Sequence, residues 1–530
     1  MCGIAVAFEW DDAAKVVAKM LQGIEHRGDI TDPIICPASD IAMATRRLRI
    51  VDATLGQQPQ LSYDGRLLIS FNGEIYNHRE LRNQLRAMGV PFRSESDTEV
   101  LVNALQVWGL QALERLNGMF AFVVVDIESG DFLAARDPFG VKPLYIVQSE
   151  DGEGYLFCSE MRPLLDASEK GDVLLLPPGY MLTKKTCSRY RTALGGPFSG
   201  SEPGDVRTLD HLMFDAVKSR LPDGLPVAVQ LSGGIDSTLV AHYARQSRTH
   251  VPCYFLGNPG APDYRYVVEY AELSGADLRI LPFDPAAPTM RSEIDHAIAV
   301  SESFEPTVVR GAVCSNRVAE AMHLDGFRVA LAGEGADELF AGYIPLEEGF
   351  LHSNAAGRAL RAECLDMMHR TCLQRIDRSG MRYELEVREP FLDPRIAAYA
   401  LELAPSALVG SVGGHIRGKK ALRDLYDLYS EQLPRSIRDR SKVPFGEGAG
   451  MDANRNEAVW LGYFEDAISN RDFRDGQKEF AAYEIISKEE LYYLRKLASV
   501  MDISRIPHLR GRVKLSALPD SDVPQQIAVA

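Results

Sequence analysis

The thiol of Cys2, directly after Met1, is the first side chain that could carry out chemistry. Aminopeptidases remove methionine before a residue this small, so we expect Cys2 to become the N-terminus. Its α-amine, with an unperturbed pKa of about 7.7–8, could then accept the thiol proton near neutral pH. A residue so near the start of a chain is also often a tail position without function. Cys2 alone therefore only suggests an N-terminal nucleophile.

A second candidate site is Ser232-Gly233-Gly234-Ile235-Asp236-Ser237, which follows the apolar run 227–231. The glycines let backbone approach an anion, and a helix expected from about residue 236 would offer unpaired N–H groups. Asp236 suits an anion site only with a divalent cation between the charges, which indicates Mg²⁺. The alternative is a strand-to-helix turn without a ligand. The string is similar to the pyrophosphate loop of enzymes that cleave ATP to AMP and pyrophosphate.

A third group of candidates, Glu334 and Asp337, follows another apolar run at 329–331. Asp337 could be a second Mg²⁺ ligand, and Glu334 could act as acid or base. If both runs are strands of one parallel sheet, both loops lie at its carboxyl edge, where ligands bind in open α/β folds. A solvated acidic loop would explain this segment alone, whereas its pairing with the glycine loop predicts an ATP site.

At least two domains must position these residues, because 530 residues exceed what one hydrophobic core usually serves. Residues 2–193 contain many short strand-like runs and few helices, which predicts an α+β layered domain. The segment 194–206 is rich in Gly, Pro and Ser and predicts a linker. A second domain is expected over 207–515, and a disordered tail over 516–530.

Local patterns predict the elements of each domain. The first should contain helices near 13–25, 79–88 and 98–108. Asp97 and Thr98 are the expected caps of the third helix. In the second domain apolar runs alternate with helical segments, as in a doubly wound parallel sheet. These runs are 227–231, 253–256, 279–282 and 329–332. Residues 350–430 are expected to be mostly helical.

Composition limits the classes of function. The chain is 46% apolar and 25% charged, and a formal net charge of −16 without a basic stripe argues against a nucleic-acid partner. Its eight cysteines form no CxxC pair and no zinc-like spacing with histidines, so no disulfide or zinc framework is expected. Because the sequence shows no signal segment and no long apolar run, we expect no membrane partner and a cytoplasmic location.

Short motifs occur along the chain from Cys2 to about residue 450. They are Cys2-Gly3-Ile4, His26-Arg27-Gly28, Arg47 to Asp52, Asn72 to Asn77, Ser96-Asp97, Gly118 to Phe122, Arg136 to Gly140, the two loops above, Pro259 to Asp263 and Glu389 to Asp393. In this order they resemble the glutamine-dependent asparagine synthetases. The resemblance implies an N-terminal-nucleophile glutaminase, an α+β layered αββα sandwich, followed by an α/β doubly wound ATP-pyrophosphatase domain. It implies glutamine, ATP and aspartate as substrates with Mg²⁺ as cofactor, and leaves a homodimer open.

In the glutaminase half, the resemblance implies that Cys2 attacks the glutamine amide. Asn72 and the N–H of Gly73 would form the oxyanion hole. The remaining glutamine-binding positions are implied to be Arg47 for the carboxylate, Glu74 and Asp97 for the α-ammonium, and Leu48, Arg49, Ile50 and Val51 around them. Taken singly, most of these would be ordinary ion-pair or turn residues.

In the synthetase half, the resemblance implies contacts to every part of ATP. Adenosine would contact Leu231, Leu256, Ala332 and Gly333, and pyrophosphate would contact Ser232, Gly233, Gly234, Asp236 and Ser237. Asp236 and Asp337 would hold Mg²⁺. Thr307 and Arg310 would handle the acyl substrate and phosphates. Lys442 would stabilise the α-phosphate, and Glu334 would assist formation and capture of the acyl-adenylate.

The chain departs from the family's pattern near the expected acyl pocket. Val443 and Pro444 stand where the family has Glu-Gln after the lysine, and Ala332 and Ala336 stand where it has serine. These changes remove a charge and hydroxyls, so the alternative acceptor is an acid other than aspartate. In a separate motif, Asp29 replaces a proline.

Two further alternatives remain. A relative, β-lactam synthetase, lacks the nucleophilic cysteine, so Cys2 argues against it. A non-catalytic protein on the same scaffold would be expected to lose Cys2, Asp236 or Glu334, and all three are present.

Overall fold

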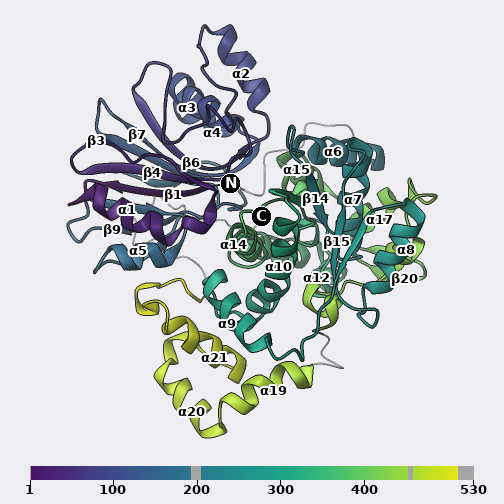
Figure 1. Ribbon diagram of the computed structural model, residues 1–530. Helices are drawn as coiled ribbons and strands as arrows, with labels where there is room; N and C mark the ends of the chain where they lie inside the picture. Colours follow the sequence, from purple (N-terminus) through teal and green to yellow (C-terminus); the bar gives the residue numbers. More distant parts are fainter. Residues whose placement is uncertain (1, 193–203, 452–456, 511–530) are drawn as a thin grey trace. The chain divides into compact units, whose positions relative to one another are not determined.

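The computed structural model describes residues 2–192, 204–451 and 457–510, which form two compact units (Figure 1). The first unit combines the chain up to Ala193 with the segment from Met501, and the second runs from Leu194 to Val500. The second unit therefore ends before the expected residue 515. Most of the expected linker, and the whole expected tail 516–530, lie outside the described residues.

Two antiparallel sheets form the first unit. One has the strand order β11-β9-β10-β1-β4-β2, with β3 also on β4, and the other has the order β13-β12-β8-β7-β6-β5. The first sheet contains β1 (Cys2–Phe8), β2 (Ile30–Thr31), β3 (Ile35–Ala38), β4 (Ile41–Arg47), β9 (Tyr145–Gln148), β10 (Tyr155–Cys158) and β11 (Leu174–Leu175). The second contains β5 (Gln60–Leu61), β6 (Leu67–Ile75), β7 (Gly118–Asp126), β8 (Asp131–Arg136), β12 (Tyr180–Leu182) and β13 (Cys187–Arg189).

The central strands are apolar at almost every position, so each sheet can bury one face against the other sheet and the opposite face against helices. Ile4 and Val6 of β1 and Val123 and Val125 of β7 belong to one buried core. The opposite face of the second sheet, with Phe71 and Phe122, packs against helices. Figure 1 shows helices outside both sheets, which confirms the predicted αββα sandwich. These helices are α1 (Ala13–Gly23) and α5 (Met161–Ala167) on one side, and α2 (His78–Ala87), α3 (Asp97–Trp108) and α4 (Ala112–Arg115) on the other.

The segment from Met501 is fastened to the first unit by hydrogen bonds. The guanidinium of Arg505 donates to the carbonyl oxygens of Ser168, Lys170 and Gly171, at 2.7–2.8 Å. The N–H of Val173 donates to the carbonyl of Arg505 at 2.7 Å. These bonds explain why the expected second domain loses its last residues to the first unit.

A five-stranded parallel sheet in the order β16-β15-β14-β17-β18 is the centre of the second unit. Its strands are β14 (Val227–Gln230), β15 (Cys253–Leu256), β16 (Leu278–Leu281), β17 (Val329–Leu331) and β18 (Glu386–Arg388). The helices around it include α6 (Val206–Ser219), α7 (Ile235–Ser247), α8 (Tyr264–Ser274), α9 (Met290–Ser301) and α10 (Pro306–Leu324). This confirms the predicted α/β doubly wound parallel sheet.

The part of the second unit that follows β17 is mostly helical, as expected. Its helices include α11 (Ala336–Leu339), α12 (Ile344–His352), α13 (Asn354–Met367), α14 (Cys372–Arg382), α15 (Pro394–Glu402), α16 (Pro405–Leu408), α17 (Lys420–Asp427) and α18 (Arg435–Asp439). A hairpin of β19 (Gly410–Val412) and β20 (His415–Arg417) interrupts them, and α19 (Glu457–Ala467), α20 (Asn470–Glu479) and α21 (Lys488–Ala498) close the unit.

Two local features differ from the sequence patterns. Strand β18, which the sequence did not indicate, interrupts the mostly helical stretch and pairs in parallel with β17. The cap of α3 is Ser96, whose hydroxyl accepts the N–H of Thr98 at 3.1 Å. Asp97 instead accepts the N–H of Ile75 at 2.9 Å and so ties the start of α3 to the end of β6.

Candidate active sites

Cys2 lies at the start of β1, a strand with neighbours on both sides, and is only 5% exposed. Its backbone nitrogen donates to Oδ1 of Asn72 at 3.0 Å. Its carbonyl oxygen accepts a hydrogen bond from Nε of Arg27 at 3.2 Å. Across the sheet Cys2 is paired with Arg47 of β4. The fold thus brings Cys2 together with Arg27, Arg47 and Asn72, which lie up to 70 positions away in the sequence.

The side chain of Asn72 is fully buried, and its Nδ2 has no hydrogen-bond partner among the described residues. Leaving a buried donor unpaired costs about 1–3 kcal/mol. The hydrogen bond from the Cys2 nitrogen to Oδ1 fixes the orientation of the Asn72 amide. Its Nδ2 is therefore suited to donate to a negatively charged oxygen. Neighbouring Gly73 admits no side chain, because a Cβ there would lie 2.1 Å from the carbonyl oxygen of Met119.

Arg47 shows a similar unsatisfied donor. Its Nε donates to Oδ2 of Asp32 at 2.9 Å, while its buried Nη1 has no partner among the described residues. The Nε side of the guanidinium is therefore fixed by Asp32, and Nη1 is available to bind the carboxylate of a ligand. Glu74 and Asp97 are both buried. They lie close to each other, because the carboxylate of Asp97 accepts the N–H of Ile75, the residue after Glu74.

The remaining glutamine-binding candidates continue from β4 into a loop. Leu48 is buried, and Ile50 and Val51 are half-buried. Arg49 is exposed and pairs with Asp29, whose Oδ2 lies 2.9 Å from its Nε. Sequence reasoning assigned no role to this aspartate, although it departs from the family's motif.

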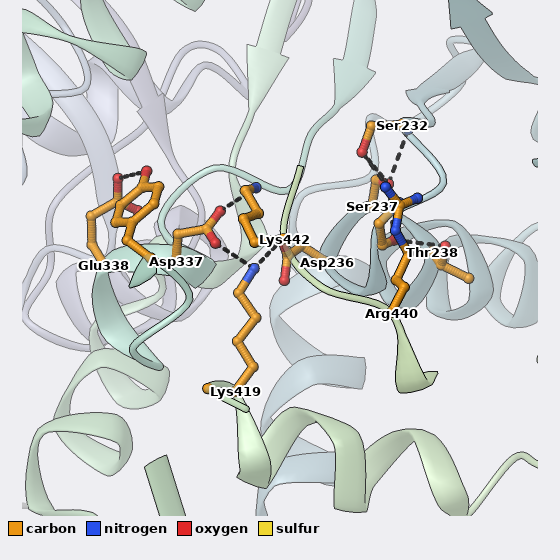
Figure 2. Close-up of polar contacts among 12 residues, drawn as sticks. Ser232, Asp236, Ser237, Thr238, Asp337, Glu338, Lys419, Arg440 and Lys442 are labelled. Atoms are coloured by element: carbon orange, nitrogen blue, oxygen red, sulfur yellow. Dashed lines mark hydrogen bonds and ion pairs between the residues drawn. The ribbon is translucent and has the colours of Figure 1, made fainter. Parts of the chain in front are cut away.

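In the second unit, the glycine loop joins β14 to α7, as the sequence predicts. Gly233 has φ +68°, a left-handed conformation that favours glycine, and Gly234 caps the helix. The hydroxyl of Ser237 accepts the N–H of Ser232 at 3.1 Å, and the two hydroxyls lie 3.1 Å apart (Figure 2). Arg440, which sequence reasoning missed, donates to the carbonyl of Gly233 at 2.8 Å.

Two lysines and two aspartates form a cluster at the carboxyl edge of the sheet, in which Lys419, Asp236 and Asp337 are buried and Lys442 is partly exposed. Nζ of Lys419 lies 2.6 Å from Oδ2 of Asp236 and 2.6 Å from Oδ1 of Asp337, and Nζ of Lys442 lies 2.6 Å from Oδ2 of Asp337 (Figure 2). Burial alone would raise the pKa of Asp337, but the charges of Lys419 and Lys442 lower it. Burial alone would lower the pKa of Lys442, but the carboxylates of Asp337 and Asp236 raise it. The site therefore holds cations where phosphates are expected.

Lys419 was not singled out from the sequence. It has φ +56°, a strained conformation for a residue with a side chain, and it directly precedes α17. Its neighbour Gly418 is confined, because a Cβ there would lie 1.8 Å from the carbonyl oxygen of Ala341. A lysine in an ordinary helix-start pattern gives no signal of this kind.

Carboxylates suitable for Mg²⁺ are few in this site. Among residues 2–192, 204–451 and 457–510, no group of three His, Cys, Asp or Glu side chains could hold a metal ion. However, Mg²⁺ is commonly bound by one or two carboxylates together with substrate phosphates. Asp236 and Asp337 provide two carboxylates, and Oδ1 of Asp236 accepts no hydrogen bond from a described residue. The donor set fits a cation that arrives with phosphates.

A cavity of about 540 Å³ extends from this cluster. Its wall includes most of the predicted synthetase residues, namely Leu231, Ser232, Asp236, Ser237, Thr307, Arg310, Ala332, Gly333, Glu334, Asp337 and Lys442. Gly234 instead lines a smaller adjoining recess. Leu256 is buried at the end of β15, and neither it nor Gly233 belongs to the wall of the cavity.

The acyl-substrate candidates are held by ion pairs. Nη2 of Arg375 donates to Oε1 of Glu334 at 2.8 Å, and Arg310 forms a two-pronged pair with Glu489. Pro444, one of the departures from the family's pattern, lines the same cavity. Neither Arg375 nor Glu489 was found from the sequence, because their partners Glu334 and Arg310 are 41 and 179 positions away.

Comparison with known proteins assigns both halves. A glutamine amidotransferase domain family matches residues 1–174, and an asparagine synthase family matches residues 208–355 and 347–489. A glutamine-hydrolysing asparagine synthetase of Asparagus officinalis is 31% identical over 477 residues, covering 85% of this chain and 78% of its own. A probable glutamine-hydrolysing asparagine synthetase of Dictyostelium discoideum is 29% identical over 541 residues, covering 94% of both chains.

A solved glutamine phosphoribosylpyrophosphate amidotransferase from B. subtilis is 18% identical and covers 49% of this chain and 67% of its own. Its TM-score of 0.32 is too low to support a functional comparison. Within the described part of the chain, no helix is long and apolar enough to cross a membrane.

Proposed function

The chain belongs to the family of glutamine-hydrolysing asparagine synthetases, and from that premise we propose that it converts a carboxylic acid to its amide with glutamine and Mg·ATP. The products would be the amide, glutamate, AMP and pyrophosphate. The proposal depends most on the Asn72 side-chain amide. Its Oδ1 accepts a hydrogen bond from the Cys2 nitrogen, and its buried Nδ2 is a donor without a partner among the described residues.

The first half-reaction is glutamine hydrolysis at Cys2. Once Met1 is removed, the α-amine of Cys2 takes the thiol proton, and the thiolate attacks the glutamine side-chain carbonyl. Nδ2 of Asn72 and the N–H of Gly73 stabilise the resulting oxyanion. The carbon–nitrogen bond breaks to release ammonia and a thioester, which water hydrolyses to glutamate. Arg47 binds the glutamine carboxylate.

The second half-reaction activates the acid. Its carboxylate attacks the α-phosphorus of ATP and displaces pyrophosphate, which gives an acyl-adenylate. Lys442 and Lys419 neutralise charge on the phosphates, and the loop from Ser232 to Ser237 holds the pyrophosphate. Asp236 and Asp337 would hold Mg²⁺, which when bound supplies further neutralisation of the phosphate charge. Ammonia then attacks the acyl carbon, with Glu334 placed to accept its proton, and AMP leaves.

Aspartate is the acceptor that we propose to test first, since the relatives are named asparagine synthetases. A second candidate is a different carboxylic acid. It is favoured by the cavity wall, where Ala332 and Pro444 stand in place of polar family residues.

The experiment measures pyrophosphate and amide formed from glutamine, ATP and a panel of acids, with the amide identified by mass spectrometry. The proposal requires at least one acid to give both products in equal amounts, and it fails if none does. The Cys2→Ala variant is expected to lose synthesis from glutamine but to keep synthesis from ammonium salts. Loss of both would contradict a separate glutaminase site.

A further inference from the structure

The carboxylate of Glu489 connects the last helices of the second unit with the wall of the cavity. It lies on α21, is 4% exposed, and accepts four hydrogen bonds. Nε and Nη2 of Arg310 donate to its two oxygens at 2.8 and 2.6 Å. Nε1 of Trp460, on α19, and the hydroxyl of Tyr493 donate to Oε1 at 2.9 and 2.7 Å.

The pair with Arg310 has the geometry that fixes a guanidinium most firmly. Two parallel hydrogen bonds restrain both the position and the plane of the guanidinium, which a single contact does not. Arg310 lies on α10, one turn after Thr307, and both residues line the 540 Å³ cavity. Glu489 itself does not line this cavity. Any effect that it has on the substrate must therefore pass through Arg310.

Holding α21 in place does not require this carboxylate. On the same helix, the hydroxyl of Tyr492 donates to Oδ1 of Asp295 at 2.8 Å, and Nζ of Lys496 lies 2.7 Å from Oδ2 of Asp295. These bonds fasten α21 to α9 independently. A buried carboxylate is costly unless a cation compensates it, and Arg310 is the cation within hydrogen-bond distance. The charge of Glu489 is thus accounted for by Arg310 rather than by the packing of helices.

We propose that Glu489 is a positioning residue of the synthetase site, which holds the Arg310 guanidinium in the orientation that receives the acyl substrate or its phosphates. The inference rests on the proposed function, because it gives Arg310 that substrate. It assigns to α19 and α21, which carry none of the sequence-predicted site residues, a part in the second half-reaction.

The test compares variants of the full-length protein by the kinetics of pyrophosphate release against the acid. Glu489→Gln keeps an oxygen for Trp460 and Tyr493 but loses the charged fork. We expect its kcat/KM for the acid to fall about 10- to 100-fold, the effect of a lost charged hydrogen bond. Arg310→Lys keeps the cation but not the fork, and should show a loss of the same order.

Tyr493→Phe is the matched control, since it removes one hydrogen bond to the same carboxylate and leaves the Arg310 pair intact. Its kcat/KM should change less than about threefold. In an Arg310→Met background, Glu489→Gln should have no further kinetic effect, because the residue through which it acts is gone. Glutamine hydrolysis at Cys2 serves as the internal control for folding.

Each outcome is decisive. Equal losses for Glu489→Gln and Tyr493→Phe, or a loss that persists in the Arg310→Met background, would show that Glu489 is structural. An active wild type with an unaffected Glu489→Gln variant would overturn the positioning role alone. A wild type that turns over no acid would refute the proposed function, and this inference with it.

Discussion

Replacing Asn72 with alanine should remove most of the glutaminase activity and leave the synthetase activity intact. The variant loses two interactions: the acceptor for the Cys2 nitrogen at 3.0 Å, and the buried Nδ2 donor. A lost oxyanion-hole donor typically costs about 2.7–4 kcal/mol, and a lost neutral hydrogen bond about 0.5–1.5 kcal/mol. The loss of the oxyanion-hole donor is the larger cost, so kcat for glutamine hydrolysis should fall about 10²- to 10³-fold.

The chain contains a matched control in the same unit. Asn103, on α3, is also fully buried, its Oδ1 accepts the N–H of Tyr63 at 2.8 Å, and its Nδ2 has no partner among the described residues. Asn103→Ala therefore makes the same chemical change in a similar environment, without a neighbouring thiol. The assay is glutamate release from glutamine, with ammonium-driven pyrophosphate release measured in parallel. If Asn72→Ala hydrolyses glutamine within about fivefold of Asn103→Ala, Nδ2 of Asn72 is not in the oxyanion hole.

Two further predictions concern the second unit. Lys419→Met removes the cation between Asp236 and Asp337, so pyrophosphate release should slow by about 10²-fold while glutamine hydrolysis is unchanged. An unaltered rate of pyrophosphate release at every ATP concentration would contradict a role of Lys419 in neutralising the phosphates. Burial opposes ionisation of Asp393, but Arg220 and Arg395 outweigh burial and hold its pKa well below the usual range. The pKa of Asp393 is lower in the folded protein than in the unfolded chain. The stability that Asp393 contributes is therefore fully present above a pH of about 4, the unfolded pKa, and is lost as the pH falls toward the pKa in the folded protein. Denaturation of Asp393→Asn should therefore show a deficit of about 3 kcal/mol near pH 7 that shrinks toward pH 3, and a deficit independent of pH would refute the pairing.

The parts of the site that the sequence predicts are those carried by local motifs. The loop Ser232–Ser237 combines a strand, glycines and a helix start within a few residues, whereas Asn72 and Gly73 were indicated only by a short motif shared with the family. Local chemistry of this kind can be recognised without knowing the fold. The two kinds of sheet follow from the order of the elements: strand-like runs with few intervening helices predict the antiparallel domain, and apolar runs that alternate with helices predict the parallel sheet.

The parts that were missed depend on long-range contacts. Lys419 reaches Asp236 across 183 positions, and Glu489 reaches Arg310 across 179, with no pattern near either residue to mark it. Strand β18 was missed because two of its three residues, Glu386 and Arg388, are charged. Both are buried, and Nε of Arg388 donates to Oε1 of Glu386 at 2.5 Å, so this edge strand lacks the apolar run that predicts a buried β-strand.

The docking of Arg505 on residues 168–173 has a consequence for how the chain folds during synthesis. The first unit contains both early residues and residues about 330 positions later, with Arg505 and Gly171 separated by 334. At a translation rate of 5–20 residues per second, the ribosome needs roughly 17–67 s to make that interval. Until Arg505 emerges, the carbonyl groups of Ser168, Lys170 and Gly171 must remain hydrated or find other partners. Of the two units, the first can therefore begin folding before the second is made, yet it cannot be completed until the second unit has been synthesised.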